Sequence, residues 1–194
     1  MSQKQRSQIR NSIREKRRQL SPQVQRQHAY GLAHNICRSR LFQNAKRLAC
    51  YLPAGGEIDP QLIIQTAWQR QKEIYLPVLS PTHQRLYFAP YTENSSMKAN
   101  RFGIDEPDVK PSSWLSARQM GLILLPLVAF DEKGNRLGMG GGFYDRSLSF
   151  SRHHKQQHRP HLIGLAHECQ KLDQLPCEVW DVPLNGVATE LRFY

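Results

Sequence analysis

Residues 120–146 read MGLILLPLVAFDEKGNRLGMGGGFYDR, the most hydrophobic run of the chain followed at once by its most glycine-rich stretch. The near-continuous apolarity of Met120–Phe130 predicts a central strand covered on both faces, whose pairing must end or bulge at Pro126. The segment 131–146 comes directly after this strand and before a helix expected over Phe143–Lys155. Because open α/β sheets bind ligands at the carboxyl ends of their strands, this segment is the candidate binding loop.

The rest of the chain supplies the neighbours of this strand. Hydrophobic periodicity and caps predict helices over 4–20, from Ser21-Pro22 through about Arg38, and over Pro60–Gln71. Strands are expected at Arg47–Pro53, Glu73–Leu79, Arg85–Tyr91, His161–His167 and Val187–Arg192. The strand, helix and strand between Arg47 and Leu79 form a βαβ unit with parallel strands and a right-handed crossover. We therefore expect one three-layer, doubly wound α/β domain over 1–194, with a mostly parallel sheet and the helices of 1–46 packed on the core.

The composition is that of one globular domain. With 194 residues and 39% hydrophobic content, the chain is long enough to bury a core. It has no run of the roughly 20 apolar residues that cross a membrane. The four cysteines are scattered without a C-x-x-C pair or metal-ligand spacing: Cys37, Cys50, Cys169 and Cys177. We therefore expect the thiols to be reduced. We also expect the protein to act in the cytoplasm as a monomer.

The net charge of +11 is confined to one quarter of the sequence. Residues 1–47 hold twelve lysines and arginines and one acid, Glu15, whereas the remainder has fifteen of each sign. Arg6, Arg10 and Arg14 recur every four residues, so their side chains project together from the first helix. The positive charge therefore belongs to one N-terminal element, which we expect to face an anion, and the rest of the chain is neutral. This distribution disfavours a nucleic-acid partner.

The glycines of the candidate loop predict a phosphate site. Gly140–Gly142 expose backbone N–H groups with no Cβ in the way, and a helix N-terminus adds partial positive charge. Neither the Walker loop nor the dinucleotide fingerprint fits, because Lys-Ser/Thr is absent and Phe143 replaces the third glycine. A hinge or tight turn is the alternative. Arg136, Arg146 and Asp145, a candidate magnesium ligand, favour nucleotide phosphates.

The segment Pro126–Arg146 resembles the signature of the 5-formyltetrahydrofolate cyclo-ligase family. Four further segments agree in order along nearly the whole chain: Ile9–Ser21, Tyr51–Pro60, Arg101–Pro107 and Leu175–Leu184. The resemblance implies a fold like the ribose-5-phosphate isomerase and CoA-transferase group. It also implies the magnesium-dependent reaction of ATP with 5-formyltetrahydrofolate, giving 5,10-methenyltetrahydrofolate, ADP and phosphate through a phosphorylated formyl intermediate.

The resemblance also implies which residues bind each ligand. The ATP-binding set is Arg6, Arg10, Arg136, Leu137, Gly138, Met139, Gly140, Gly141, Gly142, Phe143 and Tyr144. The folate-binding set is Leu52, Glu57, Met139, Gly142 and Phe143, and the magnesium ligands are Asp145 and Asp181. Phe143 stands where many members carry a tyrosine, so no hydroxyl acts at this position. The loop also lacks the lysine of some members, which leaves arginines to supply the positive charge.

Several of these assignments have a structural alternative. The N-terminal arginines could form a solvated face, Glu57 a surface turn, Asp181 a local cap or turn, and Phe143 a packing contact. His167 either faces the cleft or packs. The dense histidines His153, His154, His158 and His161 lack carboxylate or thiolate partners, which favours a solvated helix end over a metal site.

The whole-chain alternatives are a polyanion-binding module without catalysis, and another ATP-dependent ligase or kinase on the same scaffold.

Overall fold

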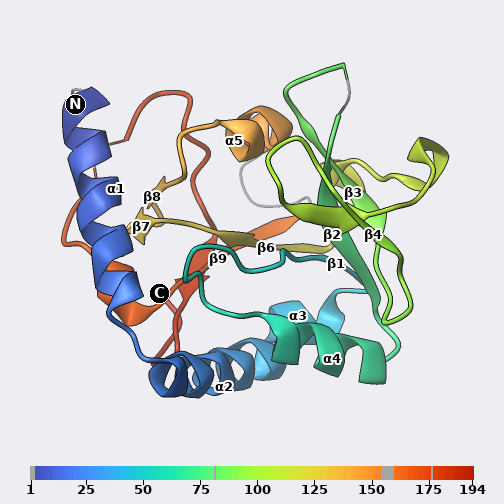
Figure 1. Cartoon of the computed structure of the whole chain (residues 1–194), viewed down its shortest axis with the longest axis horizontal. Coiled ribbons are helices and arrows are strands. Elements are labelled where there is room, and N and C mark those ends of the chain that lie inside the picture. Colours follow the sequence, from blue (N-terminus) through green and yellow to red (C-terminus); the bar gives the residue numbers. More distant parts are fainter. Residues whose placement is uncertain (1–2, 81, 154–159, 176) are drawn as a thin grey trace.

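The computed structural model describes residues 3–80, 82–153, 160–175 and 177–194, and it is built around a six-stranded sheet (Figure 1). The strand order is β10-β9-β6-β1-β2-β3. The strands span Arg47–Ala49 (β1), Glu73–Leu79 (β2), Leu86–Pro90 (β3), Leu122–Pro126 (β6), His161–Leu165 (β9) and Gly186–Ala188 (β10). Every pair is parallel except β2 with β3, so the predicted mostly parallel α/β sheet is confirmed.

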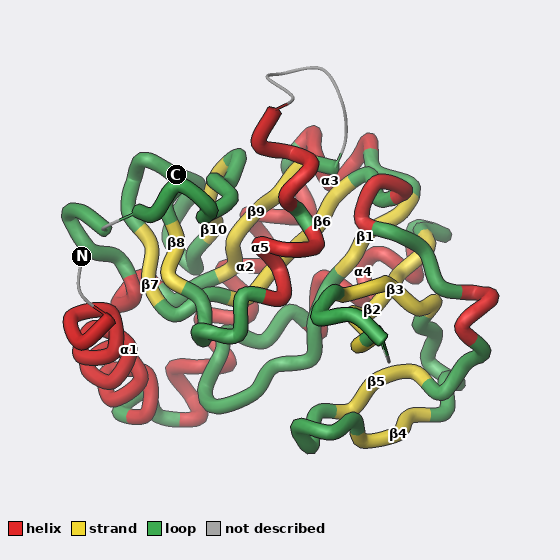
Figure 2. The backbone as a smooth tube through the Cα atoms, turned by 90° about the horizontal axis from the view of Figure 1, so that it is seen from above, coloured by secondary structure: helices red, strands yellow, loops and turns green. Residues whose placement is uncertain are grey.

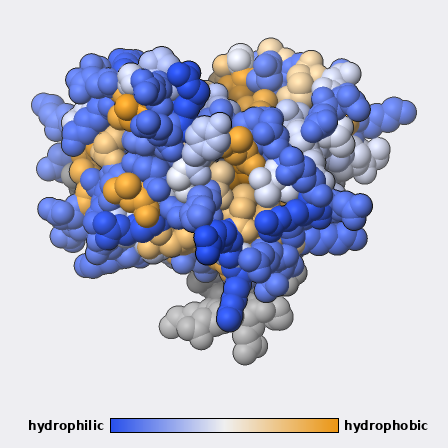
Figure 3. All heavy atoms as spheres, turned by 90° about the horizontal axis from the view of Figure 1, so that it is seen from below, coloured by the Kyte–Doolittle hydropathy of each residue, from blue (hydrophilic) through white to orange (hydrophobic). Residues whose placement is uncertain are grey.

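Helices lie on both faces of this sheet and make three layers (Figure 1). Below it in that view lie α2 (Pro22–Arg38), α3 (Arg40–Asn44) and α4 (Gln61–Gln69), and above it lies α5 (Phe143–Ser147). Seen from the side of α2–α4, the surface is mostly hydrophilic with scattered hydrophobic residues (Figure 3). Short 3₁₀ turns complete the layers at Pro111–Ser113, Ala117–Gln119, Ser149–His153 and Glu168–Gln170. None of the described helices is long and apolar enough to cross a membrane.

The sheet divides the core into two apolar clusters. Leu32 and Ile36 of α2 pack with Ile63 of α4 against one face, around Leu48 and Leu124. The opposite face buries Ile123, Leu125, Phe130, Leu148 and Val187. β6 therefore sends alternate side chains into both clusters, which is why its sequence is continuously apolar.

Helix α1 (Gln3–Arg18) lies apart from these layers, at the β7–β8 edge of the molecule (Figures 1 and 2). Its Ile13 is 1% exposed and packs with Val128, Leu137 and Leu175. The helix ends before Ser21, which caps α2 by accepting a hydrogen bond from the Val24 N–H, with Pro22 in the first turn. The Ser-Pro cap predicted from the sequence is confirmed.

The end of strand pairing expected at Pro126 is confirmed, because β6 ends there and the apolar run continues in a separate strand, β7 (Ala129–Phe130). Two expectations about the segment that follows are wrong. β7 pairs antiparallel with β8 (Arg136–Leu137), so the glycines follow a hairpin and not the central strand directly. The expected helix to Lys155 is only α5 and a 3₁₀ turn, and Lys155 lies outside the described residues.

Other bounds differ by a few residues, because local patterns define the ends of elements less sharply than their centres. β1, β9 and β10 are shorter than predicted, and β10 starts one residue before Val187. A small antiparallel sheet of β4 (Met97–Ala99) and β5 (Asp105–Pro107) was not expected. It stands off the main sheet beside β2 and β3 (Figure 2).

Candidate active site

A cleft of about 910 Å³ opens where the chain path through the sheet reverses. β1 and β6 are neighbours, but β1 leads to β2 on one side while β6 leads to β9 on the other. Segments leaving their carboxyl ends therefore diverge, which leaves a crevice. Tyr51 and Leu52 line it beyond β1, and Pro126 lines it at the end of β6.

Every residue that the sequence analysis assigned to a ligand lines this cleft. They are Arg6, Arg10, Leu52, Glu57, Arg136, Leu137, Gly138, Met139, Gly140, Gly141, Gly142, Phe143, Tyr144, Asp145 and Asp181. They come from α1, from the loop after β1, from the β8–α5 segment and from the C-terminal loop before β10. Their ligand-binding roles stay predictions.

Arginines of α1 form one wall. Arg10 donates from Nε to the Gly138 carbonyl at 2.8 Å, and Arg14 reaches the Met139 sulfur at 3.4 Å. Arg6 pairs with Asp181 at 2.5 Å. Burial lowers the pKa of Arg10, and repulsion from Arg6 and Arg14 lowers it further. Three like charges held together favour an anion between them and the loop.

Arg17 continues the arginine row of α1 but is buried beside the loop after β1 and does not line the cleft. It is 1% exposed, and it donates from one terminal nitrogen to the Gly55 carbonyl at 2.9 Å. Its Nε and Nη1 are buried without a hydrogen-bond partner. Burial lowers the Arg17 pKa, which attraction to Glu57 partly offsets. Arg17 therefore joins α1 to the loop that carries Glu57.

The glycine-rich loop 138–142 faces α1 and is shaped by its own backbone. Gly140 and Gly142 have φ angles of 106° and 63°, in the region that favours glycine. A Cβ on Gly142 would lie 2.7 Å from the Arg146 guanidinium, which donates to the carbonyls of Gly141 and Gln84, both at 2.6 Å. Arg146 therefore braces the loop and also lines the cleft, and its expected contact with phosphate stays a prediction. α5 has only five residues, so its dipole adds little.

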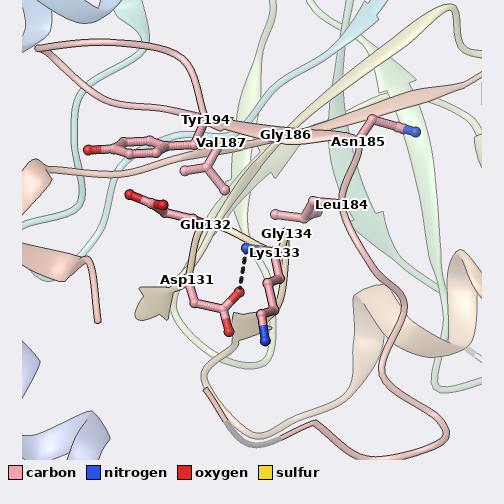
Figure 4. A pocket seen from close by; sticks show the side chains of 9 residues that line it. All are labelled: Asp131, Glu132, Lys133, Gly134, Leu184, Asn185, Gly186, Val187 and Tyr194. Atoms are coloured by element: carbon pink, nitrogen blue, oxygen red, sulfur yellow. Dashed lines mark hydrogen bonds between the residues drawn. The ribbon is translucent and has the colours of Figure 1, made fainter. Parts of the chain in front are cut away.

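Asp131 anchors the β7–β8 hairpin that precedes the loop. Its buried carboxylate accepts hydrogen bonds from the backbone N–H groups of Lys133, Asn135 and Leu175 and from the Asn135 amide, at 2.9–3.1 Å. Burial alone would raise the Asp131 pKa, but these hydrogen bonds together hold it below its usual value. Figure 4 shows the Lys133 bond at the rim of a small pocket of about 120 Å³ beside Tyr194, which is separate from the large cleft.

The two predicted magnesium ligands are each engaged by an arginine. Asp145 accepts from Arg136 at 2.6 Å and from the Val182 N–H at 3.3 Å. Asp181 accepts from Arg6 and also from the Glu178 N–H at 2.9 Å, so it serves in a local turn as well. Two carboxylates that line one cleft fit a hard cation such as Mg²⁺, which prefers oxygen ligands. Arg136 is itself buried and donates to the Val182 carbonyl.

Glu57 and two tyrosines make the cleft polar at its inner end. Burial raises the Glu57 pKa, and the hydrogen bond from the Ala54 N–H at 3.2 Å and the charge of Arg17 only partly offset this. Burial also raises the pKa values of Tyr51 and Tyr144, and the negative charge of Glu57 adds to both. The sequence left open whether Glu57 is a turn residue or lies in the cleft. The structure shows both, because its carboxylate accepts the Ala54 hydrogen bond and also lines the cleft.

The outer rim of the cleft is apolar. Phe102, Ile104, Met139 and Trp180 line it with 48–59% of their surface exposed. Phe102 meets the edge of Phe143 with ring centroids 5.8 Å apart. Large exposed apolar side chains around a cleft are typical of a site for a flat ring system.

Sequence reasoning missed the contribution of 100–105, Trp180 and Arg17. The motif Arg101–Pro107 was the signal for the first, but nothing in a local pattern brings the β4–β5 turn to Phe143. Arg17 continues the α1 arginine row and could have been included on its spacing. Among the clustered histidines, His161 is exposed, whereas His154 and His158 lie outside the described residues.

Comparison with known sequences identifies the family of this chain. The model of the 5-formyltetrahydrofolate cyclo-ligase family matches residues 2–190. A 5-formyltetrahydrofolate cyclo-ligase of Haemophilus influenzae is 41% identical over 96% of this chain and 98% of the relative. One of Escherichia coli is 40% identical over 94% of this chain and 98% of the relative.

Solved structures agree. The NMR structure of Aquifex aeolicus 5,10-methenyltetrahydrofolate synthetase is similar with a TM-score of 0.81 at 27% identity, covering 97% of this chain and 91% of that one. A 5,10-methenyltetrahydrofolate synthetase from Mycoplasma pneumoniae shares the fold with a TM-score of 0.69 at 22% identity, covering 95% of this chain and 98% of that one.

Proposed function

The chain belongs to the 5-formyltetrahydrofolate cyclo-ligase family and is an enzyme of that kind; we propose that it uses ATP and Mg²⁺ to convert 5-formyltetrahydrofolate into 5,10-methenyltetrahydrofolate, ADP and phosphate. A formamide carbonyl carbon is a poor electrophile, because the adjacent nitrogen donates electrons to it. The formyl oxygen attacks the γ-phosphorus of ATP, and ADP leaves. The N10 nitrogen then attacks the activated carbon, and phosphate leaves as the five-membered ring closes.

The arginine wall and the glycine-rich loop bind the triphosphate together. Support comes from the contact of Arg10 with the Gly138 carbonyl and from Arg6 at Asp181, which bring positive side chains and the glycine-rich backbone to one end of the cleft. Phosphoryl transfer needs the reacting oxygens in line and the phosphate charge neutralised, and it needs little covalent chemistry from the protein. Arg6, Arg10 and the backbone of Gly138–Gly142 supply both.

Asp145 and Asp181 would hold Mg²⁺, and the ion would supply charge neutralisation for the phosphoryl oxygens. Their ion pairs with Arg136 and Arg6 keep both carboxylates oriented toward the cleft before the ligand enters. Arg136 is 8% exposed, so its role is to position Asp145 and the loop.

The folate occupies the other end. Glu57 accepts hydrogen bonds from the N–H edge of the pterin, and Leu52, Met139 and Phe143 pack on its rings. Support comes from the partly buried Glu57 carboxylate that lines the cleft and from the apolar rim.

The observation that carries this proposal is the meeting of the α1 arginines with the glycine-rich loop across a single 910 Å³ cleft. The test mixes the protein with 5-formyltetrahydrofolate and Mg²⁺ and follows the near-ultraviolet absorbance of the methenyl product, with ADP and phosphate measured in parallel. We expect no product without ATP, and product, ADP and phosphate in equal amounts with it.

A non-hydrolysable ATP analogue is the matched control and should give no product. A rise in absorbance that does not depend on ATP would contradict the proposed activation step. ATP turnover without methenyl product would favour a different ATP-dependent ligase or kinase. Salt-sensitive RNA binding without turnover would favour the polyanion-binding module.

We also propose a monomer that acts in the cytoplasm on a small-molecule substrate, without nucleic acid or membrane. Support for the monomer comes from the cleft, to which one chain contributes every predicted site residue. Support for a reducing compartment comes from the four cysteines, all of which are free thiols. The wider fold grouping with ribose-5-phosphate isomerase and the CoA-transferases belongs to the same proposal.

A further inference from the structure

Three side chains from separate elements converge behind the cleft. His28 comes from α2, His167 follows β9, and Glu190 follows β10. Their ligand atoms all lie within 4.8 Å of one another, and they are the one such group of three in the described part of the chain. We propose that His28, His167 and Glu190 form a binding site for one divalent transition-metal ion of the Zn²⁺ type.

The distances are close to those of a tetrahedral site. His28 Nδ1 lies 3.5 Å from Glu190 Oε1 and 2.8 Å from His167 Nδ1. With metal–ligand bonds near 2.0–2.1 Å, two tetrahedral ligands stand about 3.3 Å apart. The first distance already matches, and the second needs the two imidazoles to separate by about half an ångström. The two imidazole rings are tilted by 52° with centroids 5.0 Å apart, so they are not stacked and each Nδ1 lies at the edge that faces the other ring.

The donor chemistry selects a transition metal over magnesium. Imidazole nitrogen with one carboxylate suits zinc and its neighbours, and two histidines with one acid are a known three-ligand zinc set. The three protein ligands leave a fourth position for water. A divalent metal binds the neutral imidazole, so His28 and His167 would bind the ion through their neighbouring Nδ1 lone pairs.

Surrounding groups orient two of the three ligands. Both Glu190 oxygens accept from the Glu168 N–H, at 3.0 and 3.3 Å, which fixes the carboxylate. His167 is fully buried, and its Nε2 is buried without a hydrogen-bond partner. Binding through Nδ1 would leave the imidazole proton on Nε2. The positive charge of Arg17 lies near His167 and disfavours a cation there. The negative charge of Glu190 has to offset it.

The site would tie α2 to the ends of β9 and β10. It is separate from the proposed ATP and folate cleft, since none of its three residues lines that cleft. The inference therefore stands whether or not the ring-closing reaction is correct, and its test does not use activity.

The test titrates the metal-free full-length protein with Zn²⁺ in competition with a chromophoric chelator. Co²⁺ then serves as a spectroscopic probe in the same protein. We expect one tight equivalent in the wild type, and binding at least about tenfold weaker in His28→Ala and in Glu190→Gln. His34→Ala is the matched control, because His34 is an exposed histidine of the same helix and should leave the tight equivalent unchanged.

His28 is 20% exposed at its side chain, so its replacement by alanine is compatible with folding, which thermal unfolding checks. X-ray absorption on the wild-type Zn²⁺ or Co²⁺ complex needs no variant and should give two imidazoles in the ligand shell. Equal affinity in wild type and His28→Ala, or a thiolate shell, would overturn the proposal. His28 and His167 would then form a hydrogen-bonded pair that binds no metal ion.

Discussion

Helix α1 and the glycine-rich loop form opposite walls of the same cleft, yet they are built in opposite ways. The loop contributes backbone groups, and its shape depends on φ angles that its own residues adopt and on the nearby Arg146. α1 contributes the charge, and within Gln3–Arg18 only Ile13 and Arg17 are buried. The loop is therefore determined locally, whereas the charge depends on a helix docked through few apolar contacts.

The largest expected effect comes from removing charge from the α1 wall. Arg10→Ala removes a guanidinium that lies at Gly138, and we expect kcat/KM for ATP to fall by about 10²–10³. Steady-state kinetics of methenyl formation measure this loss. Arg18→Ala, on the exposed side of the same helix, should change kcat/KM by less than about twofold. Equal losses in both variants would mean that overall charge, and not position, matters.

The docking of α1 should depend on one apolar side chain. Ile13→Ala leaves a cavity against Val128 and Leu137, and we expect α1 to lose about 2–4 kcal/mol of its docking free energy. Hydrogen exchange should become faster in α1 while the sheet stays protected, and the KM for ATP should rise. If α1 and the sheet lose protection together, the helix is not an independent unit and the contrast between the walls fails.

The loop wall should respond to backbone conformation. Gly142→Ala places a Cβ at φ 63° and close to Arg146, so we expect a loss of about 1–2 kcal/mol in unfolding free energy and weaker ATP binding. Chemical denaturation and ATP titration measure the two effects. Gly138→Ala is the control, because a Cβ there meets nothing within 4 Å. A Gly138 variant as unstable as the Gly142 variant would contradict local control of the loop.

The smallest expected effect is a pH-dependent one at Glu57. Burial raises the Glu57 pKa, so ionisation destabilises the fold as pH rises through that value. Glu57→Gln should therefore be more stable than the wild type at pH 7, with the difference vanishing below about pH 4, while the KM for folate rises. Thermal unfolding across pH measures the first effect.

Glu132→Gln is the control of opposite sign. The hydrogen bond and charge of Lys171 lower the Glu132 pKa, so its ionised form stabilises the fold at neutral pH. That variant should be slightly less stable than the wild type at pH 7, and the difference should vanish in acid. A stability gain in both variants would mean that lost surface charge explains the result at Glu57.

The sequence by itself determined the features that depend on neighbours along the chain. The bounds of β2 were predicted as observed, and so were the Ser21 cap of α2 and the parallel pairing of β1 with β2. Periods of 2 and 3.6, capping side chains and proline all act within a few residues. The candidate site residues were also named from the sequence, through the family resemblance of Pro126–Arg146 and of the N-terminal, Tyr51–Pro60 and Leu175–Leu184 segments.

Only the tertiary structure decided which distant groups meet. The β7–β8 hairpin forms because Asp131 binds the backbone of both its own turn and Leu175. Asp145 faces Arg136, Arg17 is buried against Gly55, and His28 meets His167 from 139 positions away. These contacts arise from the docking of separate elements on the sheet, which local patterns do not encode. The loop could therefore be predicted as a phosphate loop, but the cleft needed the whole fold to bring α1 to it.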